Sequence, residues 1–583
     1  MLNIDMQKGW FSKYGSDLTI GYCREVRQFR NAKPGYYIRN MHYAYKTPSN
    51  QFYISLLKDG KEVTPEVNCT QSKFTMTYQD VVCEFTFKDT GCMVFRLQGE
   101  NAALKLDRAV DYDSIYGYMA KYNDMDYCVV NMTSNMLKYI TTCQNGEFKL
   151  LQEWDGCDAQ SLSLLYSTQE NKVCQGFLEE VVSEWENPHY CDFDFDALVQ
   201  QNKDNFNEFL SKMPMVREEF MPQRMQAAHI LWSAYVKKHG ILKRDAMYMS
   251  KNWMNSIWSW DHCFNALALS HNMKEESIDQ FMLLFDFQHE TTGAIPDLAN
   301  DLYYFYNFCK PPIHGLAFKE ILDRNEIDSA ELLDIYNHLA KWTMWWVNYR
   351  DTDNDGIYEY RHGNDCGWDN STVFLELPPI ESPDLQTFMI TQCDVLAEIA
   401  TKLNLTDDAK KWQDRSDYLL ERMLELSIKD NLPIARQSGT EKIVESDSTL
   451  LFMPLLIADK LPKEIVSAMV NKLKNGNYIT EFGIATEPTT SKYFDPDGYW
   501  RGPIWGSEMY FITKGLIKAG EKELALDLID RFSHLCQKSG FAENYNALTG
   551  EGLRDLAFTW TSSAFLEMEN FLYKETNCVG ADA

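Results

Sequence analysis

The sequence predicts a multidomain protein in which an N-terminal antiparallel β-sandwich precedes an all-α (α/α)6 toroid. Apolar residues alternate with a period of two over the first third of the chain, and the period changes to 3.6 from about residue 200. Long loops rich in Gly, Pro, Trp and Asp then separate the helical segments. A chain of 583 residues is also too long for one ordinary hydrophobic core.

The sandwich prediction depends on short alternating runs. Phe74, Met76 and Tyr78 alternate with polar neighbours, and residues 83–87 repeat the pattern after a turn. Such alternation is typical of an antiparallel sheet with one solvated face. We expect the β-sandwich domain at 1–195, a linker at 196–216, the helical domain at 217–575 and a tail at 576–583.

The toroid prediction depends on about twelve amphipathic segments of helical period. They lie near residues 217–238, 260–272, 275–290, 312–324, 328–349, 384–404, 406–428, 447–458, 463–473, 503–519, 521–537 and 557–573. Twelve helices in six pairs favour a closed ring, with the long loops gathered at one mouth. Loops beyond about 12–15 residues inside a compact domain are usually functional.

Composition excludes several classes of partner. A formal charge of -29 argues against nucleic acid and anionic membranes. Residues 1–8 lack a secretory signal and no apolar stretch is long enough to span a bilayer, so we expect a cytoplasmic chain, although a signal removed beforehand would leave the same sequence. Fifteen scattered cysteines without a CxxC pair favour free thiols over disulfides or a zinc site. Oligomeric state is not readable.

The first motif is Trp258–Phe264, where three aromatic residues surround Asp261. Aromatic faces stack on sugar C–H surfaces and a carboxylate accepts from paired hydroxyls, so the motif suits a sugar. The alternative is an aromatic-rich helix start with Asp261 as N-cap. His262, taken singly, is expected to be structural.

The second motif is the acidic stretch at 351–371. Its first part resembles a calcium loop, but an EF-hand needs an acidic residue at position twelve, which here is His362. A single-loop structural calcium site is the prediction, and a solvated acidic turn is the alternative. The expected ligands are Asp351, Asp353, Asp355, the Ile357 carbonyl and Glu359.

The third motif is Tyr499–Trp505. Pro503 after Gly502 forms a rigid bend at a helix start, which would direct Arg501 and Trp505 into the mouth of the toroid. A simple helix entry with two packed tryptophans is the competing interpretation.

The fourth motif is 541–550, which places Glu543 between aromatic and amide side chains in a loop ahead of the last helix. A carboxylate in this position can activate a water molecule, with help from Tyr545 or Asn544. Without further context, Glu543 is better explained as one more loop carboxylate.

The motifs, taken together and in this order, resemble glycoside hydrolase family 63, the inverting α-glucosidases with an (α/α)6 catalytic domain. The resemblance covers about residues 220–575. It includes a Pro-Pro-Ile element at 310–315 and an acid loop at 365–371, in which Asp365 and Cys366 replace the family's Glu-Ser; Ala547 stands where Pro is frequent. The matching segments are Trp260–Phe264, Lys310–Gly315, Asp365–Ser371, Tyr499–Trp505 and Glu543–Gly550.

This resemblance implies that Asp369 is the general acid and Glu543 the general base. An inverting glycosidase places two carboxyl groups about 6.5–9.5 Å apart, with a water molecule opposite the leaving group. Asp369 must hold a proton, and Trp368 with Asp365 is expected to raise its pKa. The expected sugar-binding residues are Trp258, Trp260, Asp261, Phe264, Trp368, Arg501, Gly502, Trp505, Tyr545 and Trp560.

The expected substrate is a small carbohydrate, and no cofactor is required for the chemistry. An α-linked gluco-oligosaccharide cleaved from its end is favoured, and a mannosyl- or glucosyl-glycerate is the alternative. A lyase or epimerase would need a Tyr/His or Arg/His arrangement, and a phosphorolytic enzyme a phosphate-binding cluster. From a different class, a non-catalytic sugar-binding protein needs neither carboxylate.

Overall fold

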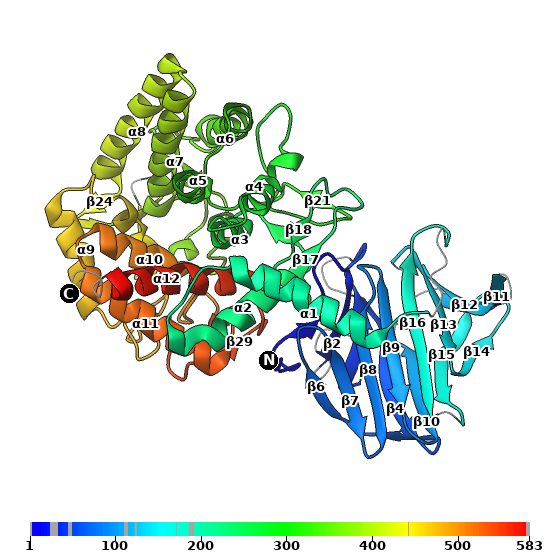
Figure 1. Cartoon of the computed structure of the whole chain (residues 1–583). Coiled ribbons are helices and arrows are strands. Elements are labelled where there is room, and N and C mark those ends of the chain that lie inside the picture. Colours follow the sequence, from blue (N-terminus) through cyan, green and yellow to red (C-terminus); the bar gives the residue numbers. More distant parts are fainter. Residues whose placement is uncertain are drawn as a thin grey trace. The chain divides into compact units, whose positions relative to one another are not determined.

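The computed structural model divides into two compact units, a β unit and a helical unit (Figure 1). The β unit comprises Met1–Ser211, Ala228–Ile241 and Ser250–Asn255, and the helical unit comprises Lys212–Ala227, Leu242–Met249 and Ser256–Ala583. The structure describes residues 3–23, 33–44, 49–109, 115–122, 125–133, 135–170, 172–185, 192–440 and 442–578.

The β unit contains two antiparallel sheets that each have eight strands among the described residues. In the first sheet the order is β1 (Trp10–Phe11), β2 (Leu18–Cys23), β3 (Gly35–Asn40), β4 (Ser49–Lys58), β10 (Ala102–Arg108), β15 (Ala159–Thr168) and β14 (Gly146–Trp154), with β5 (Lys61–Val63) on β4. In the second it is β11 (Ile115–Tyr122), β12 (Met125–Met132), β13 (Leu137–Gln144), β16 (Val173–Val181), β9 (Cys92–Gln98), β8 (Val81–Phe87), β7 (Phe74–Tyr78) and β6 (Glu66–Cys69).

One apolar core joins the two sheets and confirms the alternation predicted from sequence. Phe74 and Met76 of β7 are buried there, together with Leu104 of β10 from the other sheet. Each inward side chain is separated from the next by one that points to the opposite face, as the pleat requires. The predicted β-sandwich is therefore present.

A helix occupies most of the stretch that sequence assigned to a linker. α1 (Phe195–Lys212) places Phe195 in a second apolar cluster with Val94 and Phe177 of the second sheet. Asn202 donates to the Phe87 carbonyl oxygen at 2.7 Å. The sequence did not indicate this helix, because α1 is rich in Asn, Gln and Asp and its narrow apolar face gives little helical signal.

The predicted helical segments of the second unit are present. Their bounds are α2 (Met221–Ala234), α3 (Asp261–Leu269), α4 (Lys274–Met282), α5 (His314–Arg324), α6 (Ser329–Tyr349), α7 (Pro383–Lys402), α8 (Thr406–Leu426), η5 (Thr449–Ile457), α9 (Lys463–Asn475), α10 (Gly506–Lys518), α11 (Lys522–Ser539) and α12 (Thr559–Cys578). α12 extends into the expected tail, and residues 579–583 lie outside the described residues.

Short elements lie in the loops between these helices. The 3-10 turns are η1 (Glu218–Phe220), η2 (Phe285–Phe287), η3 (Gly363–Cys366) and η4 (Thr372–Phe374). The short strands are β17 (Tyr235–Val236), β18 (Ala246–Met247), β19 (Ile257–Trp258), β20 (Leu298–Ala299), β21 (Tyr304–Phe305), β22 (Glu359–Tyr360), β23 (Ile380–Glu381), β24 (Ile428–Lys429), β25 (Leu432–Pro433), β26 (Ala435–Gln437), β27 (Ile443–Val444), β28 (Asn544–Tyr545) and β29 (Gly552–Leu553).

Six of the helices form a closed inner ring. α3 packs on α5, α5 on α7, α7 on η5, η5 on α10, α10 on α12, and α12, red in Figure 1, returns to α3. Every residue of α3 is buried, whereas the outer helix α8 buries only Trp412, Ser416, Leu419 and Met423. That spacing of four, three and four residues is the one-sided apolar stripe of an outer helix. The (α/α)6 toroid is confirmed.

The inner helices begin where the long loops end. Each of the four motifs therefore lies just before or at the N-terminus of an inner helix: Trp258–Phe264 at α3, the acidic stretch before α7, Tyr499–Trp505 before α10 and 541–550 before α12. Because successive inner helices run in the same direction, these N-termini share one end of the ring. That end is the place to look for a site.

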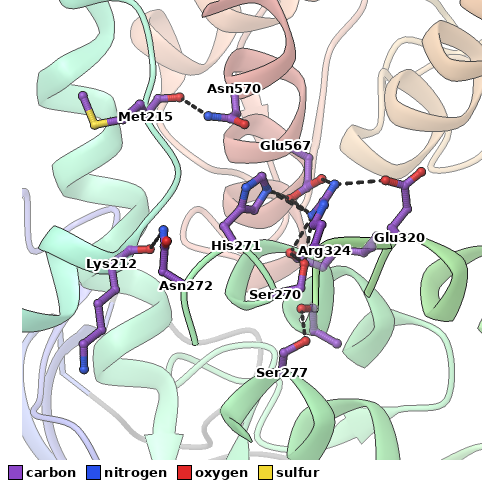
Figure 2. A network of polar contacts seen from close by, with 12 residues as sticks. Lys212, Met215, Ser270, His271, Asn272, Ser277, Glu320, Arg324, Glu567 and Asn570 are labelled. Carbon is purple, nitrogen blue, oxygen red and sulfur yellow. Dashed lines mark hydrogen bonds and ion pairs between the residues drawn. The ribbon is translucent and has the colours of Figure 1, made fainter. Parts of the chain in front are cut away.

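A buried ion-pair network ties the opposite, C-terminal end of the ring together (Figure 2). Glu567 of α12 accepts from Arg324 of α5 at 2.8 Å and from His271, just after α3, at 2.7 Å. Burial alone would raise the pKa of Glu567, but Arg324 and His271 together lower it to about 2. The network joins three inner helices by charge.

No helix among the described residues is both long and apolar enough to cross a membrane. All the described cysteines whose side chains the structure places are free, as sequence predicted.

Candidate active site

A cluster of acidic side chains surrounds one buried amine at the N-terminal end of the ring. Lys310 lies 3.2 Å from Asp297, and both side chains are almost fully buried. Burial lowers the pKa of Lys310, but the charges of Asp297, Asp369 and Asp261 outweigh it and raise the pKa. Three carboxyl groups from separate parts of the chain therefore lie within electrostatic reach of one ammonium group.

The Lys310 ammonium also fixes the acid loop. Its Nζ donates to the main-chain oxygen of Asn364 at 2.7 Å and to Oδ1 of Asn364 at 3.0 Å. Asn364 belongs to η3, five residues before Asp369. A buried lysine is tolerated only when its charge is paired and its protons find acceptors; here Asp297 pairs the charge and Asn364 accepts two hydrogen bonds.

Asp369 is partly buried, and burial is the main cause of its raised pKa. The positive charges of Lys310 and His362 oppose that rise. From the sequence, we expected the negative charge of Asp365 to help raise the pKa of Asp369. Asp365 instead pairs with Arg350 at 2.7 Å and accepts the Arg361 amide, so its charge is neutralised locally. The pKa of Asp369 is raised, as expected, but the cause is burial and not repulsion from Asp365.

The acid loop and the Tyr499–Trp505 loop are bound to each other through Asn370. Its Nδ2 donates to the Gly498 carbonyl at 2.9 Å, and its Oδ1 accepts the Trp500 amide at 2.9 Å. Arg501 Nε donates to the Asn370 carbonyl at 2.6 Å. Arg501 was expected to bind sugar hydroxyls. Its hydrogen bond instead positions Asn370, the residue that follows Asp369.

Close ring packing fixes the backbone of the acid loop. Trp368 is buried and stacks on Trp500 with ring centroids 4.6 Å apart. Gly367 has φ +78°, and a Cβ atom at this position would lie 2.5 Å from the Trp260 ring. Only glycine fits there without displacing either the loop or the indole. Gly502 likewise has a positive φ, and a Cβ there would meet the Asp495 carbonyl oxygen at 2.3 Å.

Glu543 is buried opposite this loop. The Tyr499 hydroxyl donates to its Oε1 at 3.1 Å, and the Glu543 amide donates to the Asp555 carbonyl at 2.7 Å. Burial raises the pKa of Glu543 to about 7, Asp555 adds to the rise, and the Tyr499 hydroxyl and Arg554 oppose it. Nothing in the pattern of its motif marks Tyr499 as a partner of Glu543.

Tyr499 connects the two halves of the proposed pair. Burial is the largest cause of the raised pKa of its hydroxyl, and the negative charges of Glu543, Asp369 and Asp261 raise it further. One hydroxyl thus lies within electrostatic reach of three carboxyl groups from three loops. Its backbone has φ +64°, an unfavourable region for a residue with a side chain. Such strain often accompanies functional positions.

Asp261 is the first residue of α3 and not its N-cap, which is Trp260. The alternative that Asp261 is a capping residue is therefore wrong. Burial raises the pKa of Asp261 to about 8, with Lys310 opposing the rise and Glu543 and Asp297 adding to it. Burial similarly raises the pKa of Asp297 to about 6.

Tyr545 has a structural contact in place of the one expected. It is fully buried, and its hydroxyl donates to the Gly540 carbonyl at 2.7 Å. It therefore does not help Glu543, because its only polar side-chain atom is engaged elsewhere. Tyr499 provides the hydroxyl that Tyr545 was expected to provide.

Most of the predicted aromatic walls are buried against one another. Trp505 stacks on Trp500 with centroids 3.7 Å apart, and Trp560 packs edge-on to Trp505 at 5.6 Å. Phe264 packs against Phe511 in the core behind them. Of the five tryptophans predicted to bind sugar, Trp258 alone is partly exposed, while Trp260, Trp368, Trp505 and Trp560 are buried. The buried rings support the site from behind.

The acidic stretch brings together three of its five predicted calcium ligands. Carboxylate oxygens of Asp351, Asp353 and Asp355 all lie within 4.8 Å of one another. Glu359 is not in this group. It is buried, with Oε2 accepting from Thr352 at 2.7 Å and Oε1 accepting from Arg361 at 3.3 Å.

Sequence reasoning missed Asp297, Lys310 and Tyr499. Lys310 and Tyr499 lie inside motifs that the sequence showed, but the pattern did not indicate what either side chain contacts. Asp297 follows Ala294-Ile295-Pro296 in a loop without any motif, and nothing in its local pattern separates it from a turn residue.

Comparison with known proteins places this arrangement in context. Residues 254–561 match the family model "Mannosylglycerate hydrolase MGH1-like glycoside hydrolase domain". The chain is 22% identical over 413 residues to a glucosylglycerate hydrolase from Mycolicibacterium hassiacum, covering 53% of this chain and 91% of the relative.

Two solved structures show the fold. A GH63 mannosylglycerate hydrolase from Thermus thermophilus, in complex with Tris, has a TM-score of 0.53 at 17% identity, covering 59% of this chain and 99% of the other. A bacterial glucoamylase complexed with acarbose has a TM-score of 0.67 at 12% identity, covering 97% of this chain and 94% of the other.

Proposed function

Because the chain belongs to the mannosylglycerate hydrolase MGH1-like glycoside hydrolase family, we propose that it is an inverting hydrolase of α-linked glycosides. The family model covers more than half of the chain and includes all four motifs. The expected membership of glycoside hydrolase family 63 is confirmed, and the protein is an enzyme.

One observation carries the proposal. Asp369 and Glu543 are separated by 543 − 369 = 174 residues, yet the charges of both act on the Tyr499 hydroxyl. An inverting hydrolysis needs two carboxyl groups on opposite faces of the sugar with a water molecule between one of them and the anomeric carbon. Two loops held against each other by Asn370 and Arg501 support that arrangement.

In this mechanism Asp369 donates a proton to the leaving oxygen. Burial favours its protonated form. After each turnover Asp369 regains a proton from solvent, and Glu543 releases the proton that it took from the attacking water. Glu543 accepts a proton from that water and must be ionised when the substrate binds. The Tyr499 hydroxyl favours the ionised form because it donates to the carboxylate, and it also fixes the direction in which Oε1 points.

Asp261, Asp297 and Lys310 are the residues we assign to holding the sugar at the cleaved end. All three are buried. The carboxyl groups of Asp261 and Asp297 can accept from vicinal hydroxyls, and Lys310, whose ammonium group is already engaged, holds Asp297 and the acid loop in place. Trp258, as the partly exposed ring, is the stacking surface.

The first candidate substrate is a glucosyl- or mannosyl-glycerate, the class that the names of the curated relatives describe. His362 supports this choice on the acid side, where the aglycone leaves. It is exposed and lies within electrostatic reach of Asp369, and its Nδ1 accepts the Asn364 amide, so in the neutral ring Nε2 carries the proton and can donate. A carboxylate aglycone suits such a donor.

A short α-gluco-oligosaccharide is the second candidate. The two buried cations of the site are already engaged, Lys310 by Asp297 and Arg501 by the Asn370 carbonyl. No buried guanidinium or ammonium group among the described site residues is thus left for a carboxylate, which favours a neutral aglycone.

The activity is tested by product analysis on a panel of α-linked disaccharides and glycosyl-glycerates. We expect β-sugar to appear first by NMR. Asp369→Asn and Glu543→Gln should each fold and lose about 10²–10⁴-fold in rate, whereas the exposed Asp414→Asn should retain full activity. Initial release of α-sugar would disprove inversion, and near-normal turnover by either site variant would disprove the assignment.

The same panel separates the two substrate classes. If glycerate is the aglycone, His362→Gln should raise KM for glycosyl-glycerates and leave KM for disaccharides unchanged. Equal effects on both classes, or disaccharides as the better substrates, would favour the oligosaccharide interpretation.

We also propose a structural calcium ion at Asp351, Asp353, Asp355 and the Ile357 carbonyl, without a part in the chemistry. Hard oxygen donors at alternate positions of a short loop are what Ca²⁺ prefers. One oxygen of Asp351, Oδ1, is buried and has no hydrogen-bond partner among the described residues, as expected of an oxygen that binds a cation. Glu359 is not included, because its oxygens do not lie with the three Asp carboxylates.

A further inference from the structure

The β unit contains a second cluster of metal-ligating side chains, unrelated to the proposed active site. Asp17, His42 and His239 each offer one ligand atom, and the three atoms lie within 4.8 Å of one another. Asp17 and His42 are buried, and His239 is partly exposed. All three belong to the same compact unit. We propose that these three residues form a zinc site.

The backbone holds the three ligands together independently of any ion. The Met41 amide donates to the Asp17 carbonyl at 3.0 Å, which places His42 beside Asp17. The Lys237 amide donates to the Gly15 carbonyl at 3.2 Å, which brings His239 to the same place. Segments far apart in the sequence thus meet on a scaffold of main-chain hydrogen bonds.

The tautomer of His239 leaves a lone pair directed at the cluster. Its Nδ1 lies 2.6 Å from the Lys237 carbonyl oxygen, which can only accept, so Nδ1 carries the proton. In the neutral ring Nε2 is then an acceptor, and it lies 3.7 Å from Oδ1 of Asp17. Metal-ligating histidines have this arrangement, with the second ring nitrogen donating to a carbonyl.

Asp17 supplies the second, independent observation. Its Oδ1 is buried and accepts no hydrogen bond from any described residue. A buried carboxylate oxygen without a partner is costly, and a cation removes that cost. Two ligands bound to one zinc ion at about 2.0–2.1 Å lie about 3.4 Å apart, close to the 3.7 Å between Asp17 Oδ1 and His239 Nε2.

The two imidazole rings favour neutral ligands. The centroids of His42 and His239 are 3.9 Å apart, so two positive charges would repel strongly at that distance. Glu180 is an acidic group within electrostatic reach of His42, Asp17 and His239, although it lies outside the group of three ligand atoms. Its Oε2 accepts from Asn40 at 2.6 Å.

Lys251 is the cation that faces the cluster. It is fully buried, and its Nζ donates to the Tyr235 carbonyl at 2.9 Å and to Ser12 Oγ at 3.2 Å. These bonds go to a main-chain oxygen and a hydroxyl, so the Lys251 ammonium group does not donate to Asp17 Oδ1, the oxygen that we assign to the metal.

Another group of potential ligands in the helical unit does not qualify. His262, Cys263 and His314 are close together, but His262 hydrogen-bonds to main-chain carbonyls of Trp258 and Phe281. Burial raises the pKa of the Cys263 thiol far above its usual value, which disfavours the thiolate that zinc needs. This group is a packed core cluster.

The test uses the full-length chain, stripped with chelator and reloaded with Zn²⁺ alone. We expect one zinc ion per chain after gel filtration and a higher melting temperature than the stripped protein. His239→Gln and Asp17→Asn should each weaken zinc binding by more than about 100-fold, beyond the loss of an outer hydrogen-bond partner. The exposed His534→Gln is the matched control and should bind like the wild type.

Cobalt substitution gives a readout that does not depend on the variants. Co²⁺ bound by nitrogen and oxygen should show the visible bands of a four-coordinate ion without thiolate-to-cobalt charge transfer. Charge-transfer absorption would assign the metal to a cysteine and overturn the proposal. So would undiminished zinc binding by His239→Gln, or a stripped protein that takes up no zinc.

Discussion

Tyr499 is the residue on which the charge state of Glu543 depends. Burial raises the pKa of Glu543 to about 7, and the hydrogen bond from Tyr499 is the principal opposing influence. Glu543 must be ionised to activate water, so kcat/KM should rise with pH as Glu543 loses its proton near pH 7. The falling limb of the profile belongs to Asp369, which must hold the proton that it donates and whose pKa is raised by burial.

Removing the hydroxyl should therefore move the rising limb. In Tyr499→Phe the ionised form of Glu543 loses a donor worth roughly 1.4 kcal/mol, so the limb should shift about one pH unit upward. The matched control is Tyr545→Phe, which loses the buried bond to Gly540 and should reduce stability without moving the limb. A Tyr499→Phe profile that overlays the wild type would contradict this role.

The site residues differ in how far sequence could reveal them. Asp369 and Glu543 lie within ordered motifs, so the resemblance named them before any contact was visible. Lys310 and Asp297 act through a buried ion pair between loops, and a sequence pattern does not report a contact between distant segments. Tyr545 and Tyr499 are both near the site motifs, and only the left-handed backbone of Tyr499 turns its hydroxyl toward Glu543.

At the scale of elements, apolar periodicity predicted the helices wherever one face is clearly apolar. α8 and α6 show that pattern, and their limits were predicted within two residues. α1 was missed because its contact with the sheet needs only a few phenylalanines on an otherwise polar helix. Helix η5 is apolar on all sides, so its sequence predicted how long the helix is but not which type of helix forms. The structure shows a 3-10 helix that contains Pro454.

The acidic loop is the element for which calcium makes a measurable prediction. Three carboxylates held within 4.8 Å repel one another, so Ca²⁺ should raise the melting temperature and EGTA should lower it. Calorimetric titration should show one site that Asp351→Asn with Asp353→Asn removes. The exposed pair Asp414→Asn with Asp417→Asn on α8 removes equal charge and should leave binding intact. A melting temperature that ignores both reagents would refute the site.

At the scale of the whole molecule, the ring brings motifs far apart in sequence to one end and leaves the other end to be held by charge. Alternation of inner and outer helices made the toroid predictable, since only a closed ring gives every inner helix two neighbours. Which side chains close the far end was not predictable, because Arg324, His271 and Glu567 lie in three helical regions without a motif.

That far-end network should make the stability of the helical unit depend on acid. The folded-state pKa of Glu567, about 2, is below its usual value of 4.5. Its contribution is therefore fully present above about pH 4.5 and is lost as the pH falls toward 2. Unfolding by urea, followed from about pH 7 to pH 2, should show this loss in the wild type and a flatter dependence in Glu567→Gln.

Breaking the network from the cationic side should be more damaging than neutralising it. Arg324→Met leaves Glu567 buried without its main counter-charge, a change that typically costs about 3–5 kcal/mol in the free energy of unfolding. Lys410→Met removes an equally short but exposed ion pair with Asp414 and should cost less than about 1 kcal/mol. If the two variants unfold at the same urea concentration, charge does not hold the far end of the ring, and apolar packing of α3, α5 and α12 must do so alone.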